Sequence, residues 1–412
     1  MGVGPWEAGV RAGHRGHQRL AGLAWVRRLA SHSGVRFTGT SPRHRSRHLL
    51  RLQSAIHCVQ DDGSFFLNQP NLPPAPLPAT ATLGTLTTVN LPRVFLLLGL
   101  LPATLLAGPV VEKTTWRELP AFRLSDGRTE AVVVPQLGGR CVSYRLLGGR
   151  SWLWTGEPGS ERRESPLLWG GDKTYPGPHS GWALILPKTW PPPEPDFQPH
   201  EVVSAPGALL ATLSPVWPGY GARVQRAYAF ADNGDLVITH TLAPVPGSQV
   251  VGAVWQIAQT IPTDSVYVPL HPRSPYKDNV FWFGGPKPAE DTGAQLLSPS
   301  LLRLQPKSGI VFKLGAHPKV PALAAVKDGF VFVMKADPQD GQYPEGAAGA
   351  GLSVEVYHHH LPGPGEYTEL ELLSPLRRMD RGAQLVTRWN IHALPKTPPD
   401  EPQAVARLLG LE

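Results

Sequence analysis

Polar and apolar residues alternate over short runs along most of residues 115–392. Residues 223–230 alternate strictly, and an Asn-Gly step at 233–234 leads into the apolar run 236–242. A period of two residues is typical of strands with one buried face, and an Asn-Gly step between two such runs predicts a hairpin. Further strands are predicted at 115–124, 130–135, 140–147, 151–154, 201–204, 208–213, 249–260, 266–270, 280–283, 310–314, 330–335, 352–357, 367–373 and 384–392.

A helical pattern is confined to residues 402–409, where Ala404, Leu408 and Leu409 share one face. Roughly a dozen or more strands with almost no helix predict a large β-sandwich or barrel. Such folds place ligands on a concave sheet face or at the rim that carries the loops. The pattern shows no repeat and no interior break.

Residues 170–197 are dense in glycine and proline, which excludes a helix and predicts a long, stiff loop. The stretch carries Lys173, Tyr175, His179 and Trp182. A rigid loop with charged, polar and aromatic side chains favours a binding surface. The alternative is a proline-rich segment that covers one end of a sheet, with its tryptophans packed into that end.

Residues 367–376 read Tyr-Thr-Glu-Leu-Glu-Leu-Leu-Ser-Pro-Leu. On a strand the leucines of the Glu-Leu-Glu-Leu run face one side, and Tyr367, Glu369 and Glu371 face the other. The two carboxylates lie roughly 6.6 Å apart along the strand. Like charges at that separation raise one pKa, which suits a general base. We predict the floor of a polar pocket here; the alternative is a solvent-facing edge strand.

Metal and cofactor motifs are missing. His358, His359 and His360 are consecutive, so their side chains diverge on a strand and cannot all bind one ion. The sequence has no glycine-rich phosphate loop, no Gly-x-Ser-x-Gly elbow and no Cys-x-x-Cys pair. We therefore expect no metal site and no cofactor.

Charge is divided unevenly along the 412 residues, whose net charge is +7. The residues before Gly108 hold eleven arginines, no lysine and three acids, a net +8, which leaves about −1 for the rest. The later part therefore lacks the basic patch that nucleic-acid binding needs, and no nucleic-acid partner is expected. Residues 1–88 show no sustained period, which predicts a disordered tail or a spurious upstream extension.

A secretion signal is predicted at residues 89–107, where Arg93 precedes a short apolar run that ends in small residues. The run is too short for a comfortable membrane span, and a buried apolar segment is the alternative. We expect a secreted or periplasmic protein with no stable membrane anchor after cleavage and one domain at 108–412. That domain holds one cysteine, Cys141, so it has no internal disulfide.

Four stretches resemble the galactose-mutarotase-like superfamily, and together they are similar to its uncharacterised bacterial DUF4380 branch. They are Val134-Pro135-Gln136-Leu137-Gly138-Gly139-Arg140, the stretch from Gly170-Gly171-Asp172-Lys173 to Trp190-Pro191-Pro192, Val254-Trp255-Gln256-Ile257, and Glu369-Leu370-Glu371-Leu372-Leu373-Ser374-Pro375. The likeness covers most of residues 116–392. It implies an all-β supersandwich of two large antiparallel sheets with a carbohydrate-binding concave face.

In aldose epimerases of that superfamily, a glutamate on a late strand takes the proton of the anomeric hydroxyl and a histidine protonates the ring oxygen. The resemblance implies Glu371 or Glu369 as the base. The middle strand that should carry the histidine reads Val-Trp-Gln-Ile-Ala-Gln, so the candidate acids are His179, His240 and His271. The residues expected to bind the sugar are Lys173, Tyr175, Trp182, Trp255 and Gln256.

These expectations describe an exported carbohydrate-binding protein that is an aldose epimerase, hence an isomerase, or another carbohydrate-active enzyme. The rival is a non-catalytic sugar-binding or cell-envelope protein on the same fold. A histidine that points into the cavity of the glutamates would favour the enzyme. The sequence leaves the identity of the sugar and the oligomeric state open.

Overall fold

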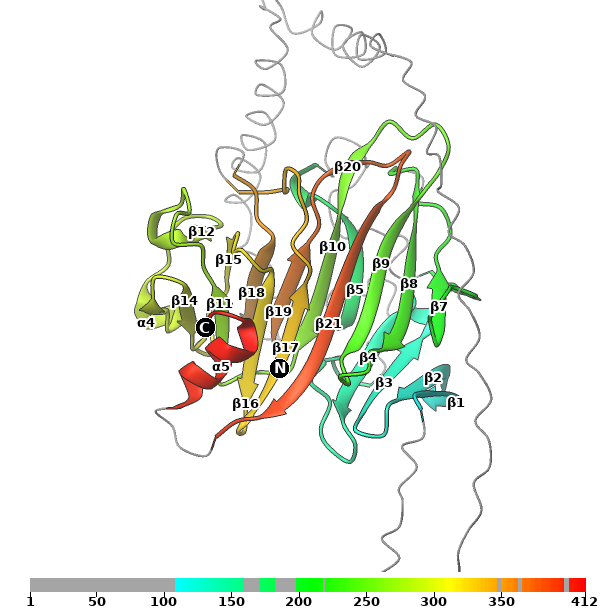
Figure 1. The fold of residues 1–412 in the computed structure, drawn as a ribbon, viewed down its shortest axis with the longest axis horizontal. Helices are drawn as coiled ribbons and strands as arrows, with labels where there is room; N and C mark the ends of the chain where they lie inside the picture. Colours follow the sequence, from blue (N-terminus) through cyan, green and yellow to red (C-terminus); the bar gives the residue numbers. More distant parts are fainter. Residues whose placement is uncertain are drawn as a thin grey trace, which may run out of the picture. The chain divides into compact units, whose positions relative to one another are not determined.

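Antiparallel strands make up most of the computed structural model, which describes residues 108–158, 170–181, 198–217, 219–346, 350–361, 365–395 and 400–412. The described strands form sheets of four, seven and ten members (Figure 1). The predicted tail at 1–88, the predicted signal at 89–107 and Trp182 lie outside the described residues.

Consecutive hairpins build the four-stranded sheet. Its strands are β1 (Val110–Trp116), β2 (Leu119–Ser125), β3 (Thr129–Val134) and β4 (Arg140–Leu146), in that order. The single strand predicted at 115–124 is wrong, because Arg117 and Glu118 form a two-residue turn with φ of 46° and 69°. Tight hairpins need such left-handed residues, usually Gly or Asn, and neither marks this turn.

The seven-stranded sheet carries the glutamate strand at its centre. Its order is β12-β15-β18-β19-β10, with β5 paired to β10 and the short β20 at one end of β10. The strands are β5 (Gly171–Gly177), β10 (Val251–Thr260), β12 (Phe281–Trp282), β15 (Phe312–Ala316), β18 (Val354–Leu361), β19 (Gly365–Leu373) and β20 (Arg377–Arg378).

The ten-stranded sheet has the order β13-β14-β11-β16-β17-β21-β9-β8-β7-β6. Its strands are β6 (Glu201–Val203), β7 (Leu210–Leu213), β8 (Ala222–Phe230), β9 (Leu236–Pro244), β11 (Ser265–Pro269), β13 (Gln295–Ser298), β14 (Leu301–Leu304), β16 (Ala322–Lys327), β17 (Phe330–Ala336) and β21 (Ala383–Ala393). The predicted Asn-Gly hairpin joins β8 to β9.

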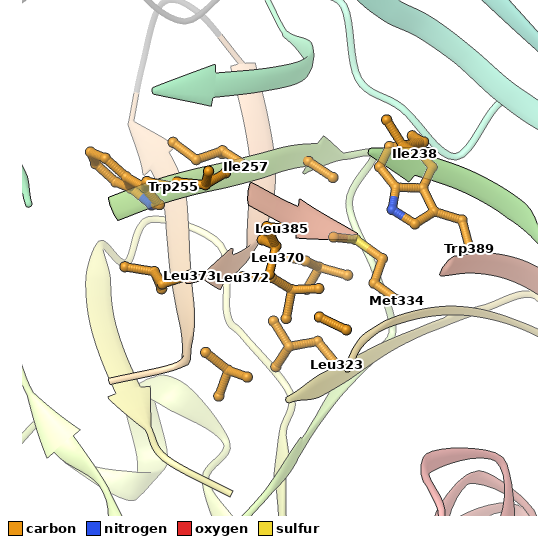
Figure 2. Close-up of a cluster of buried hydrophobic side chains, with 14 of the residues drawn as sticks. Ile238, Trp255, Ile257, Leu323, Met334, Leu370, Leu372, Leu373, Leu385 and Trp389 are labelled. Atoms are coloured by element: carbon orange, nitrogen blue, oxygen red, sulfur yellow. The ribbon is translucent and has the colours of Figure 1, made fainter. Parts of the chain in front are cut away.

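The two larger sheets pack face to face around the main hydrophobic core. Leu370 and Leu372 of β19 meet Leu323, Met334 and Trp389 of the ten-stranded sheet in this core (Figure 2). The predicted fold class, an all-β sandwich of two large antiparallel sheets, is therefore confirmed.

The stretch 171–177 is a strand, so the prediction of a continuous loop over 170–197 is wrong there. β5 pairs with β10 from Gly171↔Gln259 to Gly177↔Ala253, and all seven of its residues are buried. Among the named strands β5 pairs only with β10, and proline, which lacks a backbone N–H, is tolerated on such an edge. Pro176 is thus compatible with the strand, which positions Lys173 and Tyr175 beside the sheet centre.

Two short α-helices, α4 (Ala289–Thr292) and α5 (Glu401–Leu409), and three 3-10 helices complete the described elements. The 3-10 helices are η1 (Pro135–Leu137), η3 (His179–Gly181) and η4 (Lys277–Asn279). The helix predicted at 402–409 is confirmed as α5. Val405 and Leu409 pack against Val331 and Val333, so α5 covers the outer face of the ten-stranded sheet (Figure 1). In the described ranges, no helix combines the length and the apolar character needed to cross a membrane.

Candidate functional site

The two glutamates of β19 lie on the sheet face opposite Leu370 and Leu372. Directly opposed residues of antiparallel strands project to the same face, and the register pairs Glu371 with Glu355 and Glu369 with Tyr357. The same rule gathers side chains from five strands on one face, which we call the polar face. Its polar and aromatic members are Lys173, Tyr175, Trp255, Gln259, Lys313, Glu355, Tyr357, His359, Tyr367, Glu369 and Glu371, and the apolar Ile257 and Leu373 share the face.

Lys313, Glu355, Glu371 and Trp255 form what we call the lysine–glutamate cluster. The Lys313 Nζ lies 2.6 Å from Glu355 Oε2 and 2.9 Å from Glu371 Oε2. Trp255 Nε1 donates a hydrogen bond of 2.6 Å to Glu371 Oε2, and the ammonium lies 4.7 Å from the centre of the indole. The Glu371 side chain is fully buried, whereas 21% of the Lys313 side chain is exposed. The lysine is therefore the charged member that meets solvent.

Burial sets the proton affinities in this cluster. It raises the pKa of Glu371 to about 7; Lys313 opposes that shift and Glu355 adds to it. Burial likewise raises the pKa of Glu355. For Lys313, burial alone lowers the pKa, but the charges of Glu355 and Glu371 outweigh it and raise the value. A carboxyl with a pKa near neutrality can accept and return a proton, which is what a general base must do.

Oε1 of Glu355 and Oε1 of Glu371 accept no hydrogen bond from an N–H or hydroxyl of the described residues, and the two carboxyls hydrogen-bond each other when one of them is protonated. Buried polar atoms in folded proteins are nearly always paired, so such atoms need an explanation. A proton held between the two carboxyls supplies one partner, and a ligand with hydroxyl groups would supply further ones.

A second ion pair continues the polar face along β19. Lys173 Nζ lies 3.5 Å from Glu369 Oε1, and Gln259 Nε2 donates to the same oxygen at 2.8 Å. Burial raises the pKa of Glu369, while Lys173 lowers it and Glu371 raises it. The structure thus brings Lys173 together with both glutamates on one face.

Aromatic rings extend from this second ion pair. Trp154 stacks on Tyr367 with ring centres 4.7 Å apart, and Tyr367 stacks on His359 at 5.0 Å with planes inclined by 16°. The Tyr357 hydroxyl lies 3.2 Å from His359 Nδ1. Burial lowers the pKa of His359, which keeps its ring neutral near pH 7.

His179 and Tyr175 both contact the indole of Trp255. The ring centres of His179 and Trp255 are 5.9 Å apart in a stacked arrangement, and Tyr175 meets the indole edge-on at 5.8 Å. The turn that carries His179 is also anchored, because the backbone N–H of Ser180 donates to Glu345 Oε1 at 3.2 Å. A histidine is therefore brought to the lysine–glutamate cluster through the indole ring.

Gln256 and His240 lie between the two large sheets and not on the polar face. Gln256 Nε2 donates to Asp172 Oδ1 at 2.9 Å, and Asp172 pairs with Arg226 at 2.9 Å. His240 Nδ1 lies 2.8 Å from the hydroxyl of Thr174. Gln256 is next to Trp255, and Asp172 and Thr174 flank Lys173, so alternation along the strand turns all three away from the polar face. His240 reaches Thr174 from β9 of the ten-stranded sheet. The structure therefore separates Gln256 and His240 from the glutamates.

Other histidines are also dispersed. His271 follows β11 of the ten-stranded sheet, where its Nδ1 accepts from the Arg273 N–H at 3.0 Å. His358 faces away from His359 and has its Nδ1 3.1 Å from the Thr368 hydroxyl. In the part of the chain that the structure describes, no three His, Cys, Asp or Glu side chains are grouped to hold a metal ion.

Sequence reasoning does not find Lys313 and Glu355. Each is a lone charge between apolar neighbours, in Phe312-Lys313-Leu314 and Val354-Glu355-Val356. That pattern is a signal for a charge on a covered sheet face. Connecting both residues to Glu371 requires knowing that β15, β18 and β19 are neighbours, which is a long-range pairing.

Comparisons with known proteins yield structural likeness but no sequence family. Neither the scan against protein-family models nor the search of curated proteins finds a match. Among solved structures, a GalM/aldose epimerase homologue from C. elegans is similar at 12% identity and a TM-score of 0.40, over 65% of this chain and 97% of that one. The protein HI1317 is similar at 11% identity and a TM-score of 0.43, over 69% and 100% of the two chains. The Slr1438 protein from Synechocystis sp. PCC 6803 is similar at 10% identity and a TM-score of 0.41, over 70% and 97%.

Proposed function

We propose that the polar face binds a carbohydrate and that the protein is of the galactose-mutarotase-like class. The observation that supports this most is the lysine–glutamate cluster, in which Lys313 and the buried Glu371 both contact the indole of Trp255 and Glu355 pairs with the same lysine. Charged and amide groups can bind sugar hydroxyls, and an aromatic ring can pack against the apolar face of a sugar.

The proposed reaction is the interconversion of the two anomers of an aldose. Glu371 takes the proton of the anomeric hydroxyl while an acid gives a proton to the ring oxygen, and the bond between the anomeric carbon and the ring oxygen breaks. The open aldehyde then closes on its other face, and both protons return. A pKa of about 7 leaves Glu371 about half ionised at neutral pH, as a base for this step requires. His179, stacked on Trp255, is the candidate acid.

Proton NMR tests this reaction by measuring how fast the two anomers of an aldose equilibrate after one pure anomer is dissolved with the full chain. We expect equilibration faster than in buffer, and Glu371→Gln should lower that enhancement about a hundredfold or more, the usual contribution of a general base. The same substitution at exposed Glu112, which pairs with Arg123 on the four-stranded sheet, is the matched control. Anomers that equilibrate at the buffer rate with every aldose would contradict the reaction.

A non-catalytic sugar-binding protein is the second candidate. It is favoured by the engagement of Glu371 Oε2, which both Lys313 and Trp255 already hold. It is also favoured by β10, which presents Trp255 and Gln259 to the polar face. Aldose epimerases of the galactose-mutarotase-like superfamily carry a histidine on the comparable strand. Sugar binding without faster anomer exchange would identify this candidate.

Export is part of the same proposal and rests on the apolar run after Arg93. N-terminal sequencing of the natural protein tests it. A start near residue 108 would agree with cleavage after the predicted signal, whereas a mature chain that retains Arg11 would contradict the proposal.

A further inference from the structure

Five side chains at the Glu369 end of the polar face form a group that the proposed reaction does not use. They are Trp154, Gln259, Tyr357, His359 and Tyr367, which we call the aromatic subsite. The backbone places them together, because the Trp154 N–H donates to the Gln259 carbonyl at 2.9 Å and the register opposes His359 to Tyr367.

Three polar atoms of the aromatic subsite have no hydrogen-bond partner in the described part of the chain. They are Gln259 Oε1, His359 Nε2 and the hydroxyl of Tyr367. Their residues are 0%, 7% and 0% exposed, so water does not readily replace the missing partners. Leaving a buried polar group unpaired costs free energy, and three such atoms within one group point to a bound molecule that pairs with them.

The hydrogen-bonding character of these atoms fits adjacent hydroxyl groups. Gln259 uses its Nε2 on Glu369, so its free oxygen is an acceptor. When His359 Nδ1 accepts from the Tyr357 hydroxyl, the neutral ring carries its proton on Nε2 and offers a donor. The Tyr367 hydroxyl can donate or accept. A sugar hydroxyl does both, so neighbouring hydroxyls of one sugar unit match this set.

The rings supply a stacking surface beside these atoms. Trp154, Tyr367 and His359 form one continuous stack, with centre distances of 4.7 and 5.0 Å. Trp154 is the half-buried end of that stack and remains partly open to solvent. An aromatic ring with polar atoms at its edge is well suited to the mixed apolar and polar surface of a sugar.

The aromatic subsite and the lysine–glutamate cluster are too far apart for one ring. Tyr367 and Glu371 are four residues apart on β19, roughly 13 Å along a strand, whereas Gln259 and Tyr357 are level with Glu369, two residues or roughly 6.6 Å from Glu371. A single pyranose cannot reach from Glu371 to the paired Tyr367 and His359, whereas two linked units can.

We propose that the polar face binds an oligosaccharide, with one unit at the lysine–glutamate cluster and the next at the aromatic subsite. This inference rests on the proposed carbohydrate binding and specifies the length of the ligand. The unit at the aromatic subsite is held by Gln259, His359 and Tyr367, and Trp154 stacks against it.

Isothermal titration of the full chain tests the inference with glucose, galactose, mannose and xylose and with the disaccharides and tetrasaccharides built from them. We expect at least one disaccharide to bind about tenfold or more tightly than its monosaccharide. Tyr367→Phe should weaken that disaccharide about three- to tenfold, the effect of one neutral hydrogen bond. Because the removed hydroxyl has no hydrogen-bond partner among the described residues, the unfolding midpoint of the free variant should not fall.

Tyr267→Phe is the matched control, since it removes a hydroxyl that donates to Glu401 Oε1 at 2.7 Å on the other large sheet. It should leave disaccharide binding as it is. If disaccharides bind no tighter than monosaccharides, or if Tyr367→Phe weakens both equally, the second unit is refuted while sugar binding stands. If no sugar of any length binds, the proposed function falls together with this inference.

Discussion

Replacing Lys313 by methionine removes the ammonium that contacts the buried carboxylates of Glu355 and Glu371. Its Nζ lies 2.6 Å from Glu355 and 2.9 Å from Glu371, and methionine keeps most of the length of the aliphatic stem. The substitution therefore deletes charge with little change in packing. Lys335, on β17 of the ten-stranded sheet, offers the same substitution away from the polar face.

The expected loss depends on pH. Removing one partner of a buried ion pair costs about 3–5 kcal/mol, because it leaves an uncompensated buried charge. The folded pKa of Glu371 is about 7 against an ordinary 4.5, so its contribution to stability is fully present below pH 4.5 and is lost as the pH rises through 7. Without the lysine, the folded pKa of Glu371 rises further. While the pH lies between the unfolded and the folded pKa, each added pH unit lowers the free energy of unfolding by up to about 1.4 kcal/mol for each proton that the folded chain retains.

Urea denaturation followed by tryptophan fluorescence measures this loss. At about pH 8 we expect Lys313→Met to lower the free energy of unfolding by about 3–5 kcal/mol, and at about pH 5 by clearly less, since Glu371 is then protonated. Lys335→Met should change it by about 0.5 kcal/mol or less at either pH. An equal loss for Lys313→Met at both pH values, or a loss no larger than that of the control, would refute the reasoning.

Three further outcomes follow from buried groups. Glu371→Gln should flatten the decline of stability between about pH 4.5 and 7, because the titrating carboxyl is gone; urea denaturation across that range checks it. Arg226→Met should cost about 3–5 kcal/mol in the same assay by removing the guanidinium that pairs with Asp172 inside the sandwich, and a cost below about 1 kcal/mol would contradict this. Cys141 is fully buried, and burial raises the pKa of its thiol. In a chain whose other cysteine is removed by Cys58→Ser, iodoacetamide should therefore label Cys141 only in denaturant. Mass spectrometry measures the labelling, and a labelled folded chain would contradict the burial of Cys141.

The glutamate strand shows how far local pattern can predict a site. Period-two alternation separates Leu370 and Leu372 from Glu369 and Glu371, and the structure has the leucines in the core and the carboxylates on the other face. This works because alternation is a property of the strand itself and needs no knowledge of its neighbours.

Long-range pairing is the part that the sequence could not supply. The partners of Glu371 come from β15 and β18, and its indole donor comes from β10, more than a hundred residues earlier. The same limit explains Gln256, because its side of β10 depends on which face of that strand meets the core. Without an alignment to a known structure, nothing local fixes that choice.

Turn chemistry misled the prediction in both directions. Glycine and proline density suggested a loop at 171–177, yet an edge strand tolerates Pro176 because its N–H is not needed for pairing. Arg117 and Glu118 form a tight turn without the glycine or asparagine that usually marks one. In each case the pairing of the flanking strands outweighs the local preference.

The affinity of the full chain for the aldose panel, measured by isothermal titration alongside Glu371→Gln and Glu112→Gln, tests carbohydrate binding at the polar face most directly. At least one sugar should bind the unmodified chain and Glu112→Gln equally. Glu371→Gln should bind that sugar about three- to tenfold more weakly, because the amide keeps the shape and one carbonyl acceptor but loses the charge. Binding to none of the sugars, or equal binding to all three proteins, would contradict the claim.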